Sequence, residues 1–229
     1  MEYKVLVLGD GLLGSELIKQ TGWDYLSRKK NGIDIKDFDS WKHNMLNYDI
    51  IINCIADTNT YSNEKESHWN TNYKFVDYLI TFCNKTGTKL VHISTDYVYV
   101  NSIADASEND VPVHSSNWYS YTKLLADGLI ELKCDNYLIC RCSHKPTPFK
   151  YPEAWVDFVG NFDYVDKISS LIIDLVKKEA NGIYNVGTEL KNMYELANKT
   201  RKISGIFKPE HVPDDVSMDI KKLKKCLDI

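Results

Sequence analysis

A tyrosine and a lysine four residues apart form the pairing with the clearest chemical use in this sequence. Tyr119 and Lys123 fall in a segment, residues 118–132, whose apolar spacing predicts a helix. That spacing puts both polar groups on one helical face. A nearby ammonium favours the phenolate, so we expect Lys123 to lower the pKa of Tyr119 from about 10 and make it a proton donor or acceptor near neutral pH. Such pairs also occur by chance, so the neighbouring elements decide its meaning.

A threonine hydroxyl is the third candidate. Thr95 directly follows a run, residues 89–94, that reads as a buried strand. Polar side chains at the carboxyl ends of parallel strands lie at the edge of the sheet where ligands bind. We therefore predict that Thr95, Tyr119 and Lys123 converge on one reacting carbonyl as a catalytic set.

A glycine-rich turn precedes these residues in the chain. Gly9, Gly11 and Gly14 directly follow an apolar run, residues 3–8, and open a predicted helix over residues 12–20. Glycines at this spacing allow a tight turn and the close approach of a pyrophosphate, and the helix N-terminus supplies amide donors. The turn thus predicts dinucleotide binding, with a purely structural turn as the alternative.

A basic segment follows the second predicted strand, residues 23–26. An NAD-selective fold usually has an acidic residue there, which holds the ribose 2′-hydroxyl. This sequence instead has Ser27 followed by Arg28, Lys29 and Lys30. A hydroxyl and three cations suit the 2′-phosphate of NADPH, so we predict NADPH as the cofactor. NADH remains possible, because a solvated basic turn has the same composition.

Short β-rich runs alternate with helical patterns along the first 142 residues. Predicted strands cover residues 3–8, 23–26, 49–54, 89–94 and 137–142, and predicted helices cover 12–20, 64–84 and 118–132. This alternation predicts the α/β class, a Rossmann-type doubly wound parallel sheet over residues 1–142.

The remaining residues, 143–229, predict a small C-terminal α/β region that binds substrate and packs on the first domain. Pro146 and Pro148 interrupt the chain after Cys142, where a central strand could not continue. Beyond them, predicted helices cover residues 165–178, 193–203 and 214–227, and a predicted strand covers 182–186.

The composition excludes several classes of protein. The chain has 229 residues and a formal net charge of −4, which argues against nucleic acid as a partner. No apolar run is long enough for a membrane span or a signal peptide. The six cysteines are scattered without a CxxC pair, so we predict reduced thiols, no metal site and a cytoplasmic location.

Three motifs together carry a resemblance to a known family. They are NCIADT at residues 53–58, STDYVY at 94–99, and the YxxxK helix that continues as KLLAD at 123–127. In this order they resemble the extended short-chain dehydrogenase/reductase superfamily, and most closely the dTDP-4-dehydrorhamnose reductase family. The likeness covers residues 3–142 well and becomes thinner beyond them.

The resemblance implies an NAD(P)-dependent oxidoreductase. It implies an NADPH-dependent reductase that acts on a nucleotide-linked 4-keto-6-deoxy sugar, as in dTDP-rhamnose and polysaccharide biosynthesis, and it is compatible with a homodimer. Tyr119 would protonate the substrate oxygen as hydride arrives, Lys123 would hold the nicotinamide ribose, and Thr95 would hydrogen-bond the same oxygen.

The resemblance also implies binding residues for both ligands. The cofactor would meet the glycine turn and then the residues that carry its adenosine, ribose and nicotinamide, namely Gly9, Gly11, Leu12, Leu13, Gly14, Ser27, Arg28, Asp34, Ile35, Ala56, Asp57 and Thr58, besides Tyr119 and Lys123. The substrate would meet Asp96, Tyr97, Ser143 and His144.

The sequence departs from the family at several positions, and two other functions stay open. Leu8 stands where the family usually has its first glycine, Ser120 follows the tyrosine in place of glycine, and the region after Cys142 is short. One alternative is a nucleotide-sugar epimerase or epimerase/reductase. Another is a non-catalytic NADP-binding regulatory subunit, like that of methionine adenosyltransferase, although such a subunit has no chemical need for Thr95, Tyr119 and Lys123.

Overall fold

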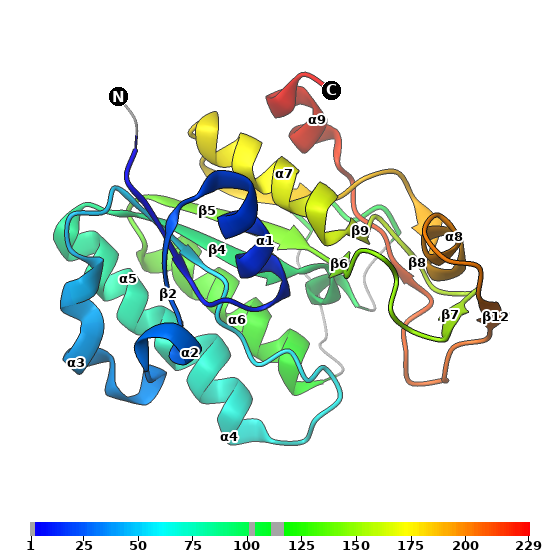
Figure 1. Cartoon of the computed structure of the whole chain (residues 1–229), viewed down its shortest axis with the longest axis horizontal. Helices are drawn as coiled ribbons and strands as arrows, with labels where there is room; N and C mark the ends of the chain where they lie inside the picture. The colour runs from blue at the N-terminus through cyan, green and yellow to red at the C-terminus, as the bar shows by residue number, and fades with distance from the viewer. Residues whose placement is uncertain (1–2, 101–103, 111–116) are drawn as a thin grey trace. The chain divides into compact units, whose positions relative to one another are not determined.

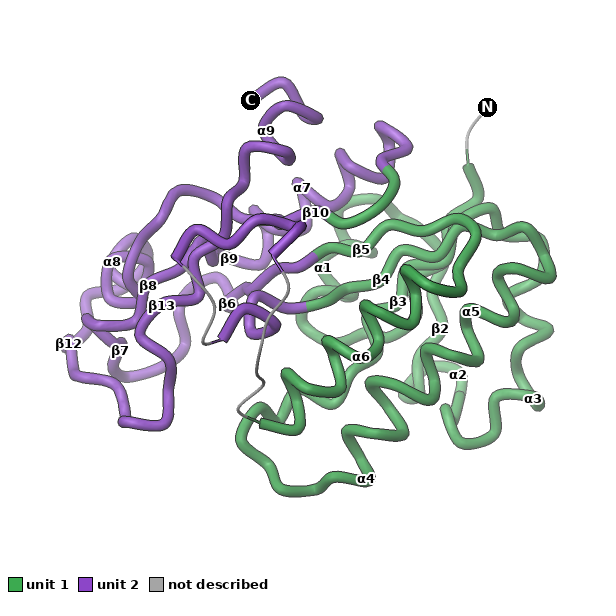
Figure 2. The backbone as a smooth tube through the Cα atoms, turned by 180° about the vertical axis from the view of Figure 1, so that it is seen from behind, with its two compact units in different colours: residues 1–94, 116–140, 181–183 green, residues 95–115, 141–180, 184–229 purple. Residues whose placement is uncertain are grey.

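Two compact units make up the computed structural model, which describes residues 3–100, 104–110 and 117–229 (Figure 2). The first unit comprises residues 1–94, 116–140 and 181–183, and the second comprises 95–115, 141–180 and 184–229. This division is more interleaved than the single boundary that we predicted at residue 142. The reason is that three strands, β4, β5 and β10, each begin in the first unit and end in the second.

A six-stranded sheet with the order β10-β5-β4-β3-β1-β2 carries the fold. Its strands are β1 (Val5–Leu8), β2 (Asp24–Leu26), β3 (Ile50–Asn53), β4 (Lys89–Thr95), β5 (Tyr137–Cys142) and β10 (Gly182–Val186). The pairs β1–β2, β1–β3 and β3–β4 are parallel. Every residue of β1 and β3 is buried, as their continuous apolar runs predict for strands covered on both faces. The predicted α/β, Rossmann-type class is confirmed.

Helices of the first unit cover both faces of this sheet. Helix α1 (Leu12–Thr21) lies on one face, and α5 (Phe75–Thr86) and α6 (Trp118–Lys133) lie on the opposite face (Figure 1). The helix predicted over residues 64–84 has three parts: α4 (Lys65–His68), a π-helical turn η3 (Trp69–Lys74) and α5. Shorter helices follow β2, namely α2 (Arg28–Asn31), η1 (Ile35–Asp37), α3 (Phe38–Trp41) and η2 (Lys42–Met45).

The order of strands reverses direction between β1 and β3. Leu8 pairs with Asn53, so the chain leaves both strands at the same edge of the sheet. Such a switch point is where open α/β sheets bind their ligands. The glycine turn follows β1 at this point, and the segment with Ala56, Asp57 and Thr58 follows β3.

The second unit has its own core and small sheets. Its aromatic residues Phe149, Phe158, Phe162 and Tyr164 pack in one buried cluster. Three small sheets with the orders β11-β8-β13, β12-β7 and β6-β9 belong to the same unit. The elements are η4 (Asp96–Tyr99), β6 (His144–Lys145), β7 (Glu153–Trp155), β8 (Val159–Gly160), β9 (Asp163–Tyr164), α7 (Val165–Lys177), β11 (Lys191–Asn192), α8 (Met193–Asn198), β12 (Ser204–Ile206), β13 (Asp215–Val216) and α9 (Lys221–Leu227).

Two predicted helices of this unit were too long. Helix α8 ends at Asn198 rather than at residue 203, and α9 begins at Lys221 rather than at residue 214. Val216, Met218 and Ile220 are buried apolar residues that alternate with the polar Ser217 and Asp219, which is the period of extended chain rather than of a helix. Residues 215–216 accordingly pair with β8.

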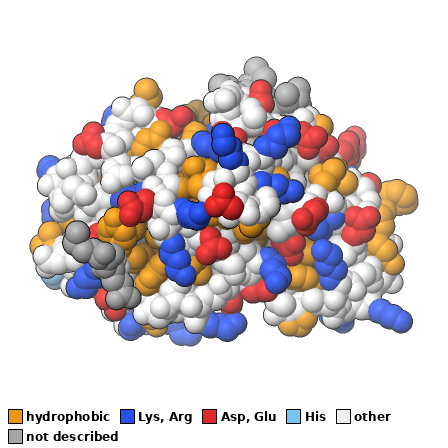
Figure 3. Space-filling view, turned by 90° about the horizontal axis from the view of Figure 1, so that it is seen from above, with side chains coloured by type: hydrophobic (Ala, Val, Ile, Leu, Met, Phe, Trp, Pro, Cys, Tyr) orange, Lys and Arg blue, Asp and Glu red, His pale blue; other side chains and the backbone are white. Residues whose placement is uncertain are grey.

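Other features of the described chain agree with the composition. Basic and acidic side chains are interspersed on the face drawn in Figure 3. All six cysteines are free thiols. Within residues 3–100, 104–110 and 117–229, no helix combines the length and apolar character that crossing a bilayer requires.

Candidate active site

Packing requires two of the three glycines in the turn after β1. Gly9 has a φ of +95°, and a Cβ there would lie 3.0 Å from Cγ1 of Ile55. A Cβ on Gly14 would lie 2.0 Å from the carbonyl oxygen of Gly9. Glycine at both positions lets α1 start directly against the ends of β1 and β3.

Gly11 faces open space instead. It is the N-cap of α1, no side chain caps the helix there, and a Cβ on Gly11 would meet nothing within 4 Å. The first-turn amides therefore have room for an anion such as a pyrophosphate, so this turn fits a dinucleotide. Leu12 is 45% exposed beside it, whereas the side chain of Leu13 packs in the core, which leaves only the Leu13 backbone for a ligand.

Ser27 is a buried helix cap. Its Oγ accepts the amide of Lys30 at 3.0 Å and donates to Oδ2 of Asp10 at 2.9 Å. The hydroxyl proton of Ser27 is thus already used, and the exposed side chains that follow it are those of Arg28, Lys29 and Lys30. The cations, rather than the hydroxyl, are the groups here that suit a phosphate.

Asp34 and Ile35 shape the next corner of the chain. The carboxylate of Asp34 accepts the amide of Lys36 at 2.9 Å, and its carbonyl accepts Nε1 of Trp41 at 2.7 Å. Ile35 packs against the core of the first unit. Both predicted adenine contacts therefore lie on a well-braced surface turn.

Asn72, which was not predicted as a site residue, holds the segment after β3 in place by hydrogen bonds. Oδ1 of Asn72 accepts the amide of Asp57 at 2.8 Å, and Nδ2 of Asn72 donates to the carbonyl of Asp57 at 3.1 Å and to Oγ1 of Thr122 at 3.3 Å. Asn72 lies in the π-helical turn η3, and such turns are frequent at functional sites. One side chain thus ties the β3 loop to α6.

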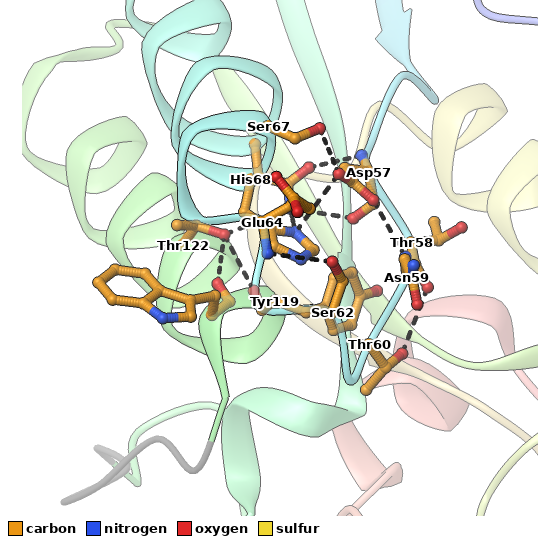
Figure 4. Close-up of polar contacts among 12 residues, drawn as sticks. Asp57, Thr58, Asn59, Thr60, Ser62, Glu64, Ser67, His68, Tyr119 and Thr122 are labelled. Carbon is orange, nitrogen blue, oxygen red and sulfur yellow. Dashed lines mark hydrogen bonds and ion pairs between the residues drawn. The ribbon is translucent and has the colours of Figure 1, made fainter.

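His68 lies between this loop and the candidate tyrosine. It is fully buried, its Nδ1 is 3.9 Å from Oδ2 of Asp57, and its ring is 6.4 Å from the ring of Tyr119 in an edge-to-face arrangement (Figure 4). The carboxylate of Asp57 also accepts the hydroxyl of Ser67 and the amide of Asn59. Protein groups therefore hold this carboxylate, while the half-buried Ala56 and the exposed Thr58 flank it.

Tyr119 and Lys123 lie one turn apart on α6, as predicted. Tyr119 is half-buried and Lys123 is buried. Nζ of Lys123 lies 2.6 Å from the carbonyl oxygen of Ile93 and 2.9 Å from Nε2 of His92, and Nδ2 of Asn53 lies 3.2 Å from Nδ1 of the same histidine. Burial, with Lys123 acting in the same direction, holds the pKa of His92 well below its usual range, so the imidazole is neutral. Lys123 is thereby anchored to the carboxyl half of β4.

Thr95 and Asp96 follow in the second unit. Oγ1 of Thr95 accepts the amide of Tyr97 at 3.2 Å and donates to Oδ1 of Asp96 at 3.2 Å. Asp96 is fully buried, and burial raises the pKa of its carboxyl to about 6 although Lys145 acts against it. Because Thr95 and Tyr119 belong to different units, their convergence on one substrate oxygen stays a prediction.

The other predicted substrate residues also lie in the second unit. Tyr97 packs against its aromatic core, and His144 lies in β6, next to the half-buried Ser143. Burial lowers the pKa of His144 to about 4, and its Nδ1 has no hydrogen-bond partner among the described residues. A neutral imidazole with an unused buried nitrogen suits a hydroxyl-bearing ligand.

The residues missed from sequence had a detectable signal. His68 and Asn72 continue the stripe formed by Val76, Ile80 and Cys83 on an otherwise apolar helix face, and His92 interrupts the buried run of β4. Buried polar groups cost free energy unless they are bonded, so polar residues on a buried face deserve a place among functional candidates.

Comparisons with known proteins find a matching family and similar relatives. The family described as RmlD substrate binding domain matches residues 3–144, more than half of the chain. The spore coat polysaccharide biosynthesis protein SpsK of Bacillus subtilis is 29% identical over 227 residues, which cover 89% of this chain and 80% of that protein. The dTDP-D-glucose 4,6-dehydratase of Mus musculus is 26% identical, over 48% of this chain and 38% of the relative.

Solved structures share the fold across nearly the whole chain. A hypothetical dTDP-4-dehydrorhamnose reductase from Sulfolobus tokodaii has a TM-score of 0.81 at 23% identity, over 96% of this chain and 93% of that one. The dTDP-4-dehydrorhamnose reductase of Bacillus anthracis, solved in complex with NADP, has a TM-score of 0.82 at 21% identity, over 98% and 93%.

Proposed function

Because the chain belongs to the RmlD substrate binding domain family, we propose that it is an NADPH-dependent reductase of the keto group of a nucleotide-linked 4-keto-6-deoxy sugar. One observation carries the proposal. The amine of Lys123 lies against Ile93 in the carboxyl half of β4, and the glycine turn lies at the carboxyl end of β1, so both occupy the ligand-binding edge of one parallel sheet.

In the proposed reaction, NADPH supplies a hydride to the carbonyl carbon. Tyr119 donates a proton to the carbonyl oxygen, and the hydroxyl of Thr95 stabilises the same oxygen. Lys123, anchored by His92 and Ile93, favours the phenolate that Tyr119 leaves behind and holds the nicotinamide ribose.

The binding of both ligands follows from the same proposal. The glycine turn and the first-turn amides of α1 hold the pyrophosphate, and Arg28 pairs with the 2′-phosphate. Asp34 and Ile35 border the adenine, and the segment after β3 borders the nicotinamide ribose. Asp96, Tyr97, Ser143 and His144 face the sugar. The solved relative from Bacillus anthracis, which binds NADP, supports this choice of cofactor.

Replacement of one phenolic hydroxyl tests the proposal. With a dTDP-linked 4-keto-6-deoxyhexose, Tyr119→Phe should lower kcat for NADPH oxidation by at least about a hundredfold, because the proton donor is lost. Its Kd for NADPH should stay unchanged. Tyr121→Phe, on the same helix but 41% exposed, is the matched control and should keep wild-type activity. Full activity in Tyr119→Phe contradicts the assignment.

The same assay separates the other two functions. An epimerase converts the keto sugar without net consumption of NADPH, so product formation in excess of NADPH oxidation favours epimerisation. Tight NADPH binding without oxidation by any dTDP-, UDP- or GDP-linked keto sugar favours a binding subunit.

A further inference from the structure

The hydroxyl of Thr95 has its single proton committed inside the protein. A threonine hydroxyl has one proton to donate and two lone pairs that accept. In the structure the proton goes to Oδ1 of Asp96, and one lone pair takes the amide of Tyr97, each at 3.2 Å. Among the described residues no further group takes the second lone pair of Thr95, which therefore remains for a ligand.

A ketone oxygen is the wrong partner for that lone pair. A carbonyl oxygen only accepts hydrogen bonds, so Thr95 can stabilise it only by donating. An alcohol, by contrast, can donate its own proton to Thr95. With Asp96 ionised, the hydroxyl of Thr95 is therefore arranged for the product of the proposed reduction rather than for its substrate.

We propose that the protonation state of Asp96 sets the direction of the Thr95 hydroxyl, and so decides whether Thr95 binds a ketone or an alcohol. This inference rests on the proposed function. A protonated Asp96 donates to Oγ1 of Thr95, which then accepts two hydrogen bonds and turns its own proton toward the keto oxygen. Asp96 acts through Thr95, so it is a positioning residue.

The surroundings of Asp96 suit a carboxyl that changes its protonation. It is fully buried, and its second oxygen, Oδ2, has no hydrogen-bond partner among the described residues. Burial raises its pKa to about 6, while Lys145, the Thr95 hydroxyl and the amides of Tyr97 and Asp96 act in the opposite direction. Both protonation states are thus accessible in a working pH range.

Among the described residues, Lys145 is the charged side chain that shifts the pKa of Asp96. Lys145 reaches it from β6, and burial lowers the pKa of this lysine while Asp96 raises it. The strand β13 also packs against η4 and carries Asp215, whose carboxylate accepts the amide of Ser217. Within the described part of the chain, Lys145 is therefore the cation that lowers the pKa of Asp96.

A pH profile of keto-sugar reduction tests the inference. For the wild type, kcat/KM with NADPH and a dTDP-linked 4-keto-6-deoxyhexose should fall about tenfold per pH unit above the inflection near pH 6, because the protonated fraction falls by that factor. Asp96→Asn cannot titrate, and its profile should be flat from pH 5.5 to 8.5. Asp127→Asn changes another buried carboxyl that accepts a serine hydroxyl, at 3.0 Å from Ser94, and should keep the wild-type inflection.

Substitution of Thr95 separates a positioning role from direct contact with substrate. Thr95→Ser keeps the hydroxyl and should keep the inflection. Thr95→Val should lose most activity, and its residual activity should lack the inflection, because Asp96 then has no hydroxyl to turn. An inflection that persists in Thr95→Val overturns the inference and assigns direct contact to Asp96.

A titration without substrate distinguishes failure of the coupling between Asp96 and Thr95 from failure of the proposed function. Carbon-13 labelling of the aspartate carboxyls lets NMR follow Asp96, identified by its absence in Asp96→Asn. The hydrogen bond from the Thr95 hydroxyl stabilises the Asp96 carboxylate, so Thr95→Val, which removes it, should raise the Asp96 pKa. Thr95→Ser keeps the hydroxyl and should leave that pKa unchanged. An unchanged titration overturns the coupling even in an active enzyme. Absence of reduction at every pH overturns the proposed function and, with it, the role toward a ketone.

Discussion

The amine of Lys123 lies 2.9 Å from Nε2 of His92, and each side chain is only 1% exposed. The neutral imidazole therefore serves as an anchor for this amine, and the carbonyl of Ile93 serves as another. Fixing a lysine with four rotatable bonds near Tyr119 costs considerable side-chain entropy, and these contacts offset that cost. Strand β4 thus fixes the position of an amine that belongs to a residue of α6.

His92 should make stability depend on pH in one direction. Its pKa is held below its usual range in the folded state, so the unfolded chain binds a proton below pH about 6.5 that the folded chain does not. Stability is therefore lost as pH falls. In His92→Gln, the difference in unfolding free energy between pH 7.5 and 5 should shrink by about 2 kcal/mol, measured by urea denaturation. His43→Gln, at an exposed position, should leave that difference unchanged.

Asp96 should make stability depend on pH in the direction opposite to that of His92. Burial raises its pKa to about 6, so the folded chain binds a proton more tightly than the unfolded chain, and stability is lost as pH rises through 6. Asp96→Asn should remove about 2 kcal/mol of this loss between pH 4.5 and 7.5, measured by urea denaturation. The exposed Asp135 provides the control, because Asp135→Asn should follow the wild type. Parallel wild-type and Asp96→Asn curves would contradict the expectation.

Substitution of two glycines of the turn should affect different properties of the protein. Gly11→Ala places a methyl group in open space, so stability should change by less than about 1 kcal/mol while NADPH affinity falls at least about tenfold, because the pyrophosphate approaches there. Gly14→Ala drives a methyl group into the carbonyl of Gly9 and should cost about 1–3 kcal/mol of stability. Thermal unfolding and NADPH titration of both variants check this, and equal affinity in Gly11→Ala would argue against the turn as a pyrophosphate site.

Arg28 should discriminate between the two nicotinamide cofactors. Its side chain is exposed beside the Ser27 cap, where the 2′-phosphate of NADPH is proposed to bind. Arg28→Ala should raise the Kd for NADPH about tenfold and leave the Kd for NADH unchanged, because one charge-assisted pair is lost. Lys19→Ala, which removes a cation paired with Glu16 on α1, is the control. A similar loss for both cofactors would place Arg28 away from the 2′-phosphate.

Much of the first unit could be predicted from local patterns. The strands β1 and β3, the helix that carries Tyr119 and Lys123, and the glycine turn are all encoded in short contiguous stretches, whose hydrophobic period is visible in the sequence. The secondary structure of the second unit is harder to predict, because its elements are short. Residues 214–220 were predicted as helix, although Val216, Met218 and Ile220 follow the period of extended chain.

The sequence by itself determined the α/β class, the glycine turn and the spacing of Tyr119 and Lys123, because each depends only on residues close together in the chain. The tertiary structure decided which distant groups meet. It set His92 against Lys123 and Asn72 against Asp57, and it buried Asp96 beside Thr95. Local periodicity carries no information about such meetings, since packing creates them, and packing also sets the burial that shifts the pKa values of His92 and Asp96.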